Sequence, residues 1–259
     1  MKLAAFGGVY SNHLALDAVL ADIGAAGVDA TWCLGDLGGF GPHPDRAIER
    51  LRASGVPSLR GNYDASIGAG LADCGCGYTD PRDNRFAQIS YDYTLARTAA
   101  AHRGWMRALP ETHRFEAAGR HVLLCHGSPR RVNEFLWDSS TSDAFLEWLC
   151  DAHQTDVILC SHTGLHWHRR LPSGRHVVNA GAIGRPANDG TPRIRYALVT
   201  ISAQDLDVSF RAVGYDHATL AREMEAECLP QEFIETIRTG WWTTCLENMP
   251  ARERARGRF

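Results

Sequence analysis

The sequence predicts an α/β protein in which two stacked β-sheets are flanked by helices. Short apolar runs alternate with helical patterns over the first sixty residues, and strand-like runs return from residue 120 onwards. A helix-rich stretch separates these two parts. Two strand-rich parts around a helical middle indicate two sheets rather than one.

The first sixty residues have a βαβαβ rhythm. Apolar runs at 3–6, 30–34 and 56–59 predict strands, and helical patterns at 13–26 and 45–54 predict the helices between them. Such alternation is typical of parallel strands. A Gly-rich or polar loop follows each predicted strand, and because open α/β sheets bind ligands at the carboxyl ends of their strands, we expect these loops to converge on one crevice.

The rest of the chain predicts two helices, six strands and a helical end. Residues 83–109 have the helical pattern, and the strand-like runs lie at 120–125, 157–160, 167–171, 176–179, 194–201 and 206–212. Residues from about 215 to 259 read as a helical C-terminal extension, in which Trp241-Trp242 fits core packing and a pocket wall equally well. Because we find no repeat or linker, we expect one domain over 1–259.

Composition excludes several classes of function. A formal net charge of -3 gives no electrostatic footprint for nucleic acid. The apolar run near the N-terminus is too short for a signal-peptide core or a membrane span, so we expect a cytoplasmic protein without membrane attachment. The eight cysteines are scattered over predicted strands and helices, and we expect most of them to be buried thiols.

Four polar side chains directly follow predicted strands and form a candidate metal site. They are one carboxylate, one amide and two imidazoles: Asp36, Asn62, His126 and His162. This set of oxygen and nitrogen donors suits a divalent metal such as Mn, Fe or Zn. Any one of them alone is more typical of a turn or a structural histidine, so the prediction rests on the combination.

The motifs around these residues resemble the successive motifs of the calcineurin-like metallophosphoesterases, in particular the small bacterial phosphodiesterases and phosphatases. The resemblance runs from about residue 2 to residue 199 and rests on four motifs: Gly35-Asp36, Gly61-Asn62-Tyr63-Asp64, Cys125-His126-Gly127 and Ser161-His162-Thr163. It implies a four-layer α/β/β/α sandwich with a dinuclear site between the sheets. It also implies that Asp36 bridges two metal ions and that Asn62, His126 and His162 hold the second.

The ligands that this family dedicates to the first metal are replaced here. Gly8 and Tyr10 stand at the positions of its Asp-x-His motif, and Gly164 stands where the second histidine of its Gly-His-x-His motif would be. Because the loss is confined to one half-site, we expect an altered site with one firm metal position, and the sequence leaves a second position open. Tyr63 stands where the family carries the histidine assigned as the acid for the leaving group.

Three groups are candidates for rebuilding the vacated position. Tyr10 would bind trivalent iron through its phenolate or simply hydrogen-bond within the crevice. His166 and His168 share one face of a predicted strand, and either would have to turn a nitrogen into the gap. Cys74-Gly75-Cys76 is a third candidate chelate, although such a pair is more typical of a loop feature.

Arginines follow two of the predicted ligand loops. Arg130 and Arg131 come after the His126 motif, and Arg185 comes after the polar loop 179–184. A guanidinium grips phosphate through a planar fork of donors, so these arginines are candidate phosphate-binding groups. Solvent-facing arginines at loop ends would fit the sequence equally well.

The function that the resemblance implies is metal-dependent hydrolysis of a small phosphorylated substrate, by a phosphatase or a phosphodiesterase. We expect Tyr63 to donate a hydrogen bond to the leaving group and Asp64 to orient the loop that carries them. Two alternatives stay open. One is a non-catalytic protein that binds a phosphorylated ligand or a partner through its metal, and the other is a metalloenzyme of different chemistry, for oxidation or bond cleavage.

Overall fold

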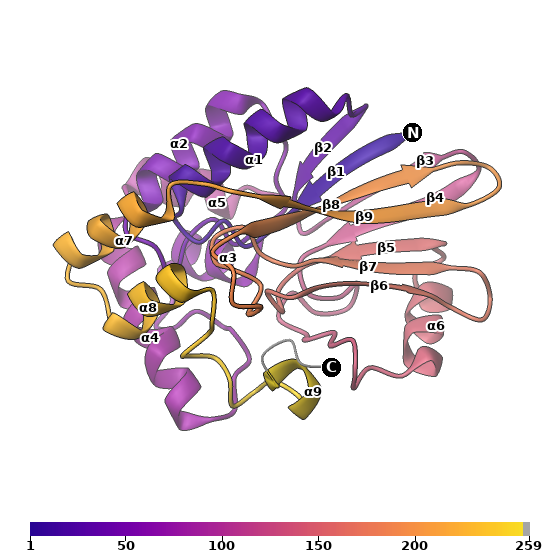
Figure 1. Cartoon of the computed structure of the whole chain (residues 1–259). Coiled ribbons are helices and arrows are strands. Elements are labelled where there is room, and N and C mark those ends of the chain that lie inside the picture. The colour runs from indigo at the N-terminus through magenta and orange to yellow at the C-terminus, as the bar shows by residue number, and fades with distance from the viewer. Residues whose placement is uncertain (256–259) are drawn as a thin grey trace.

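The chain folds into two stacked sheets with helices on both outer faces, as the computed structural model shows for residues 1–255 (Figure 1). The first sheet has the order β2-β1-β8-β9, with bounds Ala30–Cys33, Lys2–Phe6, Ile194–Ile201 and Leu206–Val213. The second has the order β3-β4-β5-β7-β6, with bounds Thr112–Ala117, Arg120–Cys125, Val157–Cys160, His176–Ala180 and His166–Arg170. The predicted α/β/β/α sandwich is confirmed.

Helices α1 and α2 cover the first sheet, and α6 covers the second (Figure 1). Their bounds are His13–Ala26, Pro44–Ser54 and Asp143–Ala152. The other helices lie mostly towards one end of the sheets (Figure 1): α3 (Asn62–Ala69), α4 (Pro81–Arg97), α5 (Ala100–Arg107), α7 (His217–Ala226), α8 (Gln231–Thr239) and α9 (Ala251–Arg254).

Strand β1 is apolar after Lys2 because both of its faces are buried from Leu3 to Phe6. Side chains alternate between the two faces of a strand. Leu3 and Ala5 join the core between the sheets, whereas Ala4 and Phe6 join the core beneath the helices. This double burial places the end of β1, and the loop after it, in the middle of the molecule.

Two sequence predictions need correction, and two elements were not predicted. Residues 56–59 do not form a third strand, since they make one parallel bridge, from Ser58 to Cys33. Pro57 lacks the amide hydrogen that a longer ladder would need. The predicted loop at Asn62 is the first turn of α3. The sequence analysis also missed β3, a half-exposed edge strand, and α6.

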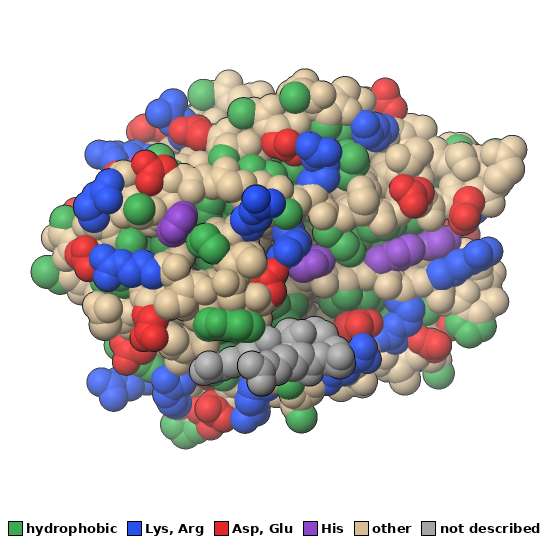
Figure 2. All heavy atoms as spheres, viewed as in Figure 1, with side chains coloured by type: hydrophobic (Ala, Val, Ile, Leu, Met, Phe, Trp, Pro, Cys, Tyr) green, Lys and Arg blue, Asp and Glu red, His purple; other side chains and the backbone are tan. Residues whose placement is uncertain are grey.

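The C-terminal extension is helical where the structure describes it. It contains α7, α8 and α9, and residues 256–259 lie outside the described residues. Within residues 1–255, we find no helix with the length and apolarity that crossing a membrane requires. Figure 2 shows basic and acidic side chains interspersed over the visible face rather than gathered by sign.

Candidate metal centre

The loops that carry the predicted ligands meet at one end of the two sheets. The loop after β1 is joined to the loop after β2 by a hydrogen bond from Gly8 N to Gly35 O, at 2.9 Å. The ends of β4 and β5 are joined by a hydrogen bond from Ser161 N to His126 O, at 2.7 Å. Four segments that are far apart in sequence therefore meet at this crevice, as predicted from the strand ends.

Asp64 holds the loop of Asp36 in place. Its buried carboxylate accepts hydrogen bonds from the backbone N–H groups of Asp36 at 2.8 Å, Leu37 at 3.0 Å and Gly61 at 2.8 Å. Burial and the charge of Asp36 raise the pKa of Asp64 to about 6, although the three N–H groups favour its ionised form. Both oxygens face backbone, so Asp64 fixes the start of α3 against the loop after β2.

The close approach of these two segments explains two of the motif glycines. A Cβ atom at Gly35, whose φ is +92°, would overlap the backbone nitrogen of Gly61. A Cβ atom at Gly61 would in turn overlap the carboxylate of Asp36. Both positions need glycine because the loop after β2 packs directly on the start of α3.

Asp36, His126 and His162 form a compact buried cluster. One ligand atom from each lies within 4.8 Å of the others. His126 Nε2 is 3.2 Å from Asp36 Oδ2 and 3.2 Å from His162 Nδ1. The three side chains are at most 7% exposed. A carboxylate and two imidazoles arranged in this way are suitable donors for a divalent metal ion.

Hydrogen bonds fix the orientation of His126 and Asp36. His126 Nδ1 lies 2.7 Å from the carbonyl oxygen of Leu34, so Nδ1 carries a proton and Nε2 is the nitrogen that faces the cluster. Burial opposes ionisation of both groups, yet their mutual attraction lowers the pKa of Asp36 and raises that of His126. Tyr63 N donates to Asp36 Oδ1 at 3.0 Å.

His162 and Asn62 present polar atoms that have no protein partner. Among the described residues, neither His162 Nε2 nor Asn62 Oδ1 has a hydrogen bond, although both atoms are buried. Burial and the neighbouring His126 lower the pKa of His162 to about 3, so its imidazole is neutral and able to bind a metal. Buried polar atoms without partners are rare, and a metal bound to the cluster would satisfy the oxygen of Asn62. The residues present therefore fit the metal that the sequence predicted.

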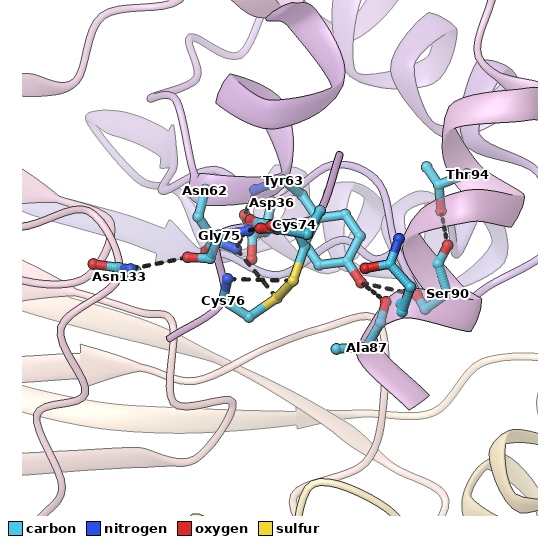
Figure 3. The surroundings of a disulfide bond; sticks show 12 residues. Asp36, Asn62, Tyr63, Cys74, Gly75, Cys76, Ala87, Ser90, Thr94 and Asn133 are labelled. Atoms are coloured by element: carbon cyan, nitrogen blue, oxygen red, sulfur yellow. Dashed lines mark hydrogen bonds between the residues drawn. A yellow bond between two sulfur atoms is a disulfide. The ribbon is translucent and has the colours of Figure 1, made fainter. Parts of the chain in front are cut away.

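A disulfide between Cys74 and Cys76 lies beside Asn62 (Figure 3). Asn62 Nδ2 donates to the carbonyl oxygen of Cys74 at 2.9 Å, which turns the amide oxygen away from the loop. Asn133 Nδ2 holds the same loop through Gly75 O, at 2.9 Å. Because the two sulfurs are bonded to each other, they are not a pair of thiolate ligands, and the loop serves to orient Asn62.

Tyr63 and Tyr10 both line the cavity beside the cluster. The Tyr63 hydroxyl donates to Ser90 Oγ at 3.1 Å and lies 3.3 Å from Ala87 O, both on α4 (Figure 3). Tyr10 is buried, and burial raises its pKa, so its phenol is neutral in this environment. Ser90 and Ala87 on α4 therefore hold the Tyr63 hydroxyl.

The structure places His166 and His168 away from this cluster. His166 packs against Phe210 with the rings tilted and their centroids 4.6 Å apart, and it lines a separate cavity. His168 Nε2 lies 2.9 Å from His176 Nδ1. Burial lowers the pKa of His166 to about 4. The side chains of His166 and His168 on β6 therefore face a separate cavity and His176, respectively, and not the cluster.

The three candidate arginines have different surroundings. Arg185 is only 5% exposed and lines the cavity with Asp36. Arg130 pairs with Glu134, its Nε donating at 2.9 Å, and Arg131 is exposed. Only Arg185, of these three, is directed at the cluster's cavity.

The sequence analysis missed most of the wall on the side of the C-terminal extension. Phe233 and Cys245 line the cavity, and the Trp242 ring lies against Arg185, with the guanidinium carbon 3.3 Å from the ring centroid. The adjacent tryptophans were the one available clue, and the sequence did not say which of them faces the site. Trp242 is the buried one, at 1% exposed.

Comparison with known proteins places the chain in a family. Residues 1–204 match the calcineurin-like phosphoesterase superfamily domain, and the chain belongs to that family, as its motifs predicted. Metallophosphoesterases of this kind use divalent metals. Trp242 and Cys245 lie beyond the matched residues.

Three relatives span nearly the whole chain. The crystal structure of a metallophosphoesterase from Sphaerobacter thermophilus is 27% identical, with a TM-score of 0.70, over 93% of this chain and 99% of that one. A hypothetical protein from Pyrococcus horikoshii has the same fold, at 23% identity and a TM-score of 0.76 over the same shares. An uncharacterized protein from Methanocaldococcus jannaschii is 23% identical over 254 residues, 92% of this chain and 98% of the relative.

Proposed function

We propose that this protein is a metal-dependent phosphoester hydrolase with a single metal position, formed by Asp36, Asn62, His126 and His162. The buried cluster of Asp36, His126 and His162 carries the proposal, and the unpartnered Asn62 oxygen in the same cavity supports it. A bound Mn, Fe or Zn ion would supply positive charge that polarises a phosphoryl oxygen and lowers the pKa of a coordinated water.

Side chains and backbone groups of the protein orient the metal ligands, bind the phosphoryl group and assist the leaving group in this proposal. Leu34 keeps the proton of His126 on Nδ1, and Asp64 keeps Asp36 at the cluster. We propose that Arg185 receives phosphoryl oxygens, since it is the buried cation of the cavity. Tyr63 would donate to the leaving group after exchanging its bond to Ser90, which is why we expect leaving-group quality to matter.

The setting of this activity is also part of the proposal. We propose one domain over 1–259, a small phosphorylated substrate and a cytoplasmic location. Six free cysteines among the described residues support a reducing compartment, whereas the disulfide beside Asn62 would need local protection there. Arg130 and Arg131 remain candidates for contacts with parts of a substrate that lie outside the cavity.

Loss of a ligand tests the proposal most simply. We expect His126→Ala and Asp36→Asn to lose the metal and, with it, hydrolysis of aryl phosphate mono- and diesters by about 100-fold or more. Metal content by mass spectrometry and turnover are measured beside the wild type. Metal loss with wild-type turnover would refute the catalytic role. A wild type that holds metal but hydrolyses no phosphoester would favour the non-catalytic binding protein or the metalloenzyme of different chemistry.

Tyr63→Phe tests the proposed donor to the leaving group. If the hydroxyl protonates or hydrogen-bonds that group, kcat should fall by about 100-fold for alkyl phosphates and much less for nitrophenyl phosphate, whose leaving group needs no proton. Equal and small losses on both substrates would assign the hydroxyl to packing against α4.

A further inference from the structure

Arg185 is a buried cation without a counter-ion in the described protein. No carboxylate of residues 1–255 lies within ion-pair distance of it, and its Nε has no hydrogen-bond partner there. Its neighbours are aromatic rings instead, with guanidinium-to-centroid distances of 3.3 Å to Trp242, 5.7 Å to Tyr10 and 5.7 Å to Phe40. The thiol of Cys245 also lies against it, within hydrogen-bonding reach of the guanidinium, and is not a carboxylate. Burying an unpaired charge is costly, so this arrangement favours a bound anion.

The guanidinium lies where the missing ligands would point. A Cβ atom added at Gly164 would lie 3.3 Å from Arg185 Nη2 and 2.8 Å from the Trp242 ring. A Cβ atom added at Gly8 would lie 2.8 Å from Cζ of Tyr10. Gly8, Tyr10 and Gly164 are the three positions that lack the family's first-metal ligands. Arg185 and its aromatic neighbours therefore fill the space that those ligands would enter.

The cavity between Arg185 and the metal cluster is small. Its volume is about 50 Å³, and its lining includes Asp36, Asn62 and His162 on one side and Arg185 on the other. At roughly 10–15 Å³ for each water-sized group, it holds about three to five such groups. A cavity of this volume suits the oxygens of one tetrahedral anion. Sites that enclose drug-sized ligands are much larger, at roughly 300 Å³ or more.

We propose that the guanidinium of Arg185 stands in for the first metal ion and binds the phosphoryl oxygens of a phosphomonoester. This inference rests on the proposed metal cluster and adds a fixed organic cation opposite it. The site then takes one metal ion and one terminal phosphoryl group. A monoester presents three unsubstituted phosphoryl oxygens to the metal and the guanidinium, whereas a diester presents two, so monoesters are the preferred class.

The aromatic surroundings explain how an arginine serves in this place. Stacking occupies the face of the guanidinium, so its edge, which includes the unpartnered Nε, is the part that can form a fork to two phosphate oxygens. Trp242 is itself fixed, since its backbone N donates to Asn188 Oδ1 at 2.8 Å and its Nε1 donates to Pro186 O at 2.6 Å. A guanidinium, unlike a metal ion, needs no carboxylate or imidazole ligands. This fits the loss of all three first-metal ligands of the family, at Gly8, Tyr10 and Gly164.

The test combines metal content with calorimetric binding of inorganic phosphate to the metal-loaded full-length chain. We expect the wild type to hold one metal ion per chain. Arg185→Met, which is neutral and of similar length, should keep that ion and bind phosphate about 10- to 100-fold more weakly, the range for charge-assisted hydrogen bonds. Arg185→Lys keeps the positive charge but not the planar fork of donors. Its phosphate affinity should therefore lie between those of the wild type and Arg185→Met. Arg52→Ala is the matched control, because Arg52 also lies over a tryptophan, Trp105 at 5.5 Å, but on the outer helix α2. This substitution should leave metal content and phosphate affinity unchanged.

The possible results separate a failure of the Arg185 inference from a failure of the proposed metal site. Two metal ions per wild-type chain, or wild-type phosphate affinity in both Arg185 variants, would overturn the inference. So would faster wild-type hydrolysis of a phosphodiester than of the matching monoester. Because the wild-type stoichiometry and substrate preference need no variant, poor folding of Arg185→Met leaves the inference testable. A wild type that binds no metal would overturn the proposed function instead, even if phosphate binding still depended on Arg185.

Discussion

At the scale of residues, the site is built on backbone conformations that most side chains avoid. Asp36 has a φ of 59° and His162 a φ of 64°, both in the left-handed region. Tyr10 and Ser11, in the loop after β1, also have positive φ. Such conformations cost on the order of 1–3 kcal/mol each and persist only where surrounding contacts enforce them. Three N–H bonds to Asp64 supply that enforcement for Asp36 and its neighbours.

Asp64→Asn should therefore destabilise the fold and weaken metal binding together. An amide retains one acceptor oxygen but places an NH₂ group against backbone donors, leaving buried N–H groups without partners at about 1–3 kcal/mol. Urea unfolding gives the free energy of unfolding, and a zinc titration gives the metal affinity. Unchanged stability and metal affinity with abolished turnover would instead place Asp64 on the substrate.

The sequence was sufficient to propose the candidate ligands that the structure brings together, but not the residues that hold them in place. Asp36, Asn62, His126 and His162 directly follow strands or begin a helix, and local patterns identify such positions. The partners of Arg185 could not be found in this way, because Trp242 reaches it from 57 residues further along the chain and no motif links them. The roles of Asp64 and of the Cys74–Cys76 loop depend on backbone contacts that periodicity does not encode.

At the scale of elements, prediction succeeded where hydrophobic periodicity was strong. The bounds of α1 agree with the predicted helix, and β4, β5 and β8 agree with the predicted strands. Prediction failed where a tertiary contact decides the structure. Edge strand β3 is held mainly by pairing with β4, and its own pattern is half polar. The start of α3 is a helix because Asp64 caps it through Gly61 N.

An ion pair fastens α1 to the first sheet and should respond to pH. The Asp22 carboxylate accepts from Arg211 Nε and Nη2, both at 2.7 Å, and from the Tyr196 hydroxyl at 2.7 Å. The hydrogen bonds from Arg211 lower the pKa of Asp22 below its ordinary value of about 3.9. The unfolded chain therefore binds more protons in that range, so the stabilisation is complete above about pH 5 and is lost as pH falls through the folded pKa.

Asp22→Asn measures this contribution. We expect the variant to unfold at lower urea concentration than the wild type at pH 7, and the difference to shrink below about pH 4. Asp17→Asn is the control on the same helix, since Asp17 makes only a 3.6 Å exposed pair with Arg50. A difference that stays constant from pH 7 to pH 3 would contradict the assignment to the Asp22 charge.

At the scale of the whole molecule, the C-terminal extension completes a site that the family domain begins. The matched domain ends at residue 204, and α8 and the segment after it contribute Phe233, Trp242 and Cys245 to the cavity. The fold class, the stacking of two sheets and the helical nature of the extension were all predictable from periodicity and motifs. The placement of the extension over the site was not predictable. It depends on packing between distant segments, and no sequence motif marks that packing.

Anomalous diffraction from crystals grown with Mn²⁺ or Zn²⁺ and phosphate tests the central claim most directly. The account predicts one anomalous peak in this crevice, in contact with Asp36, Asn62, His126 and His162, and phosphate density between that peak and Arg185. The guanidinium should keep its place against Trp242. Two metal peaks in the crevice, or one peak held by other residues, would contradict the account.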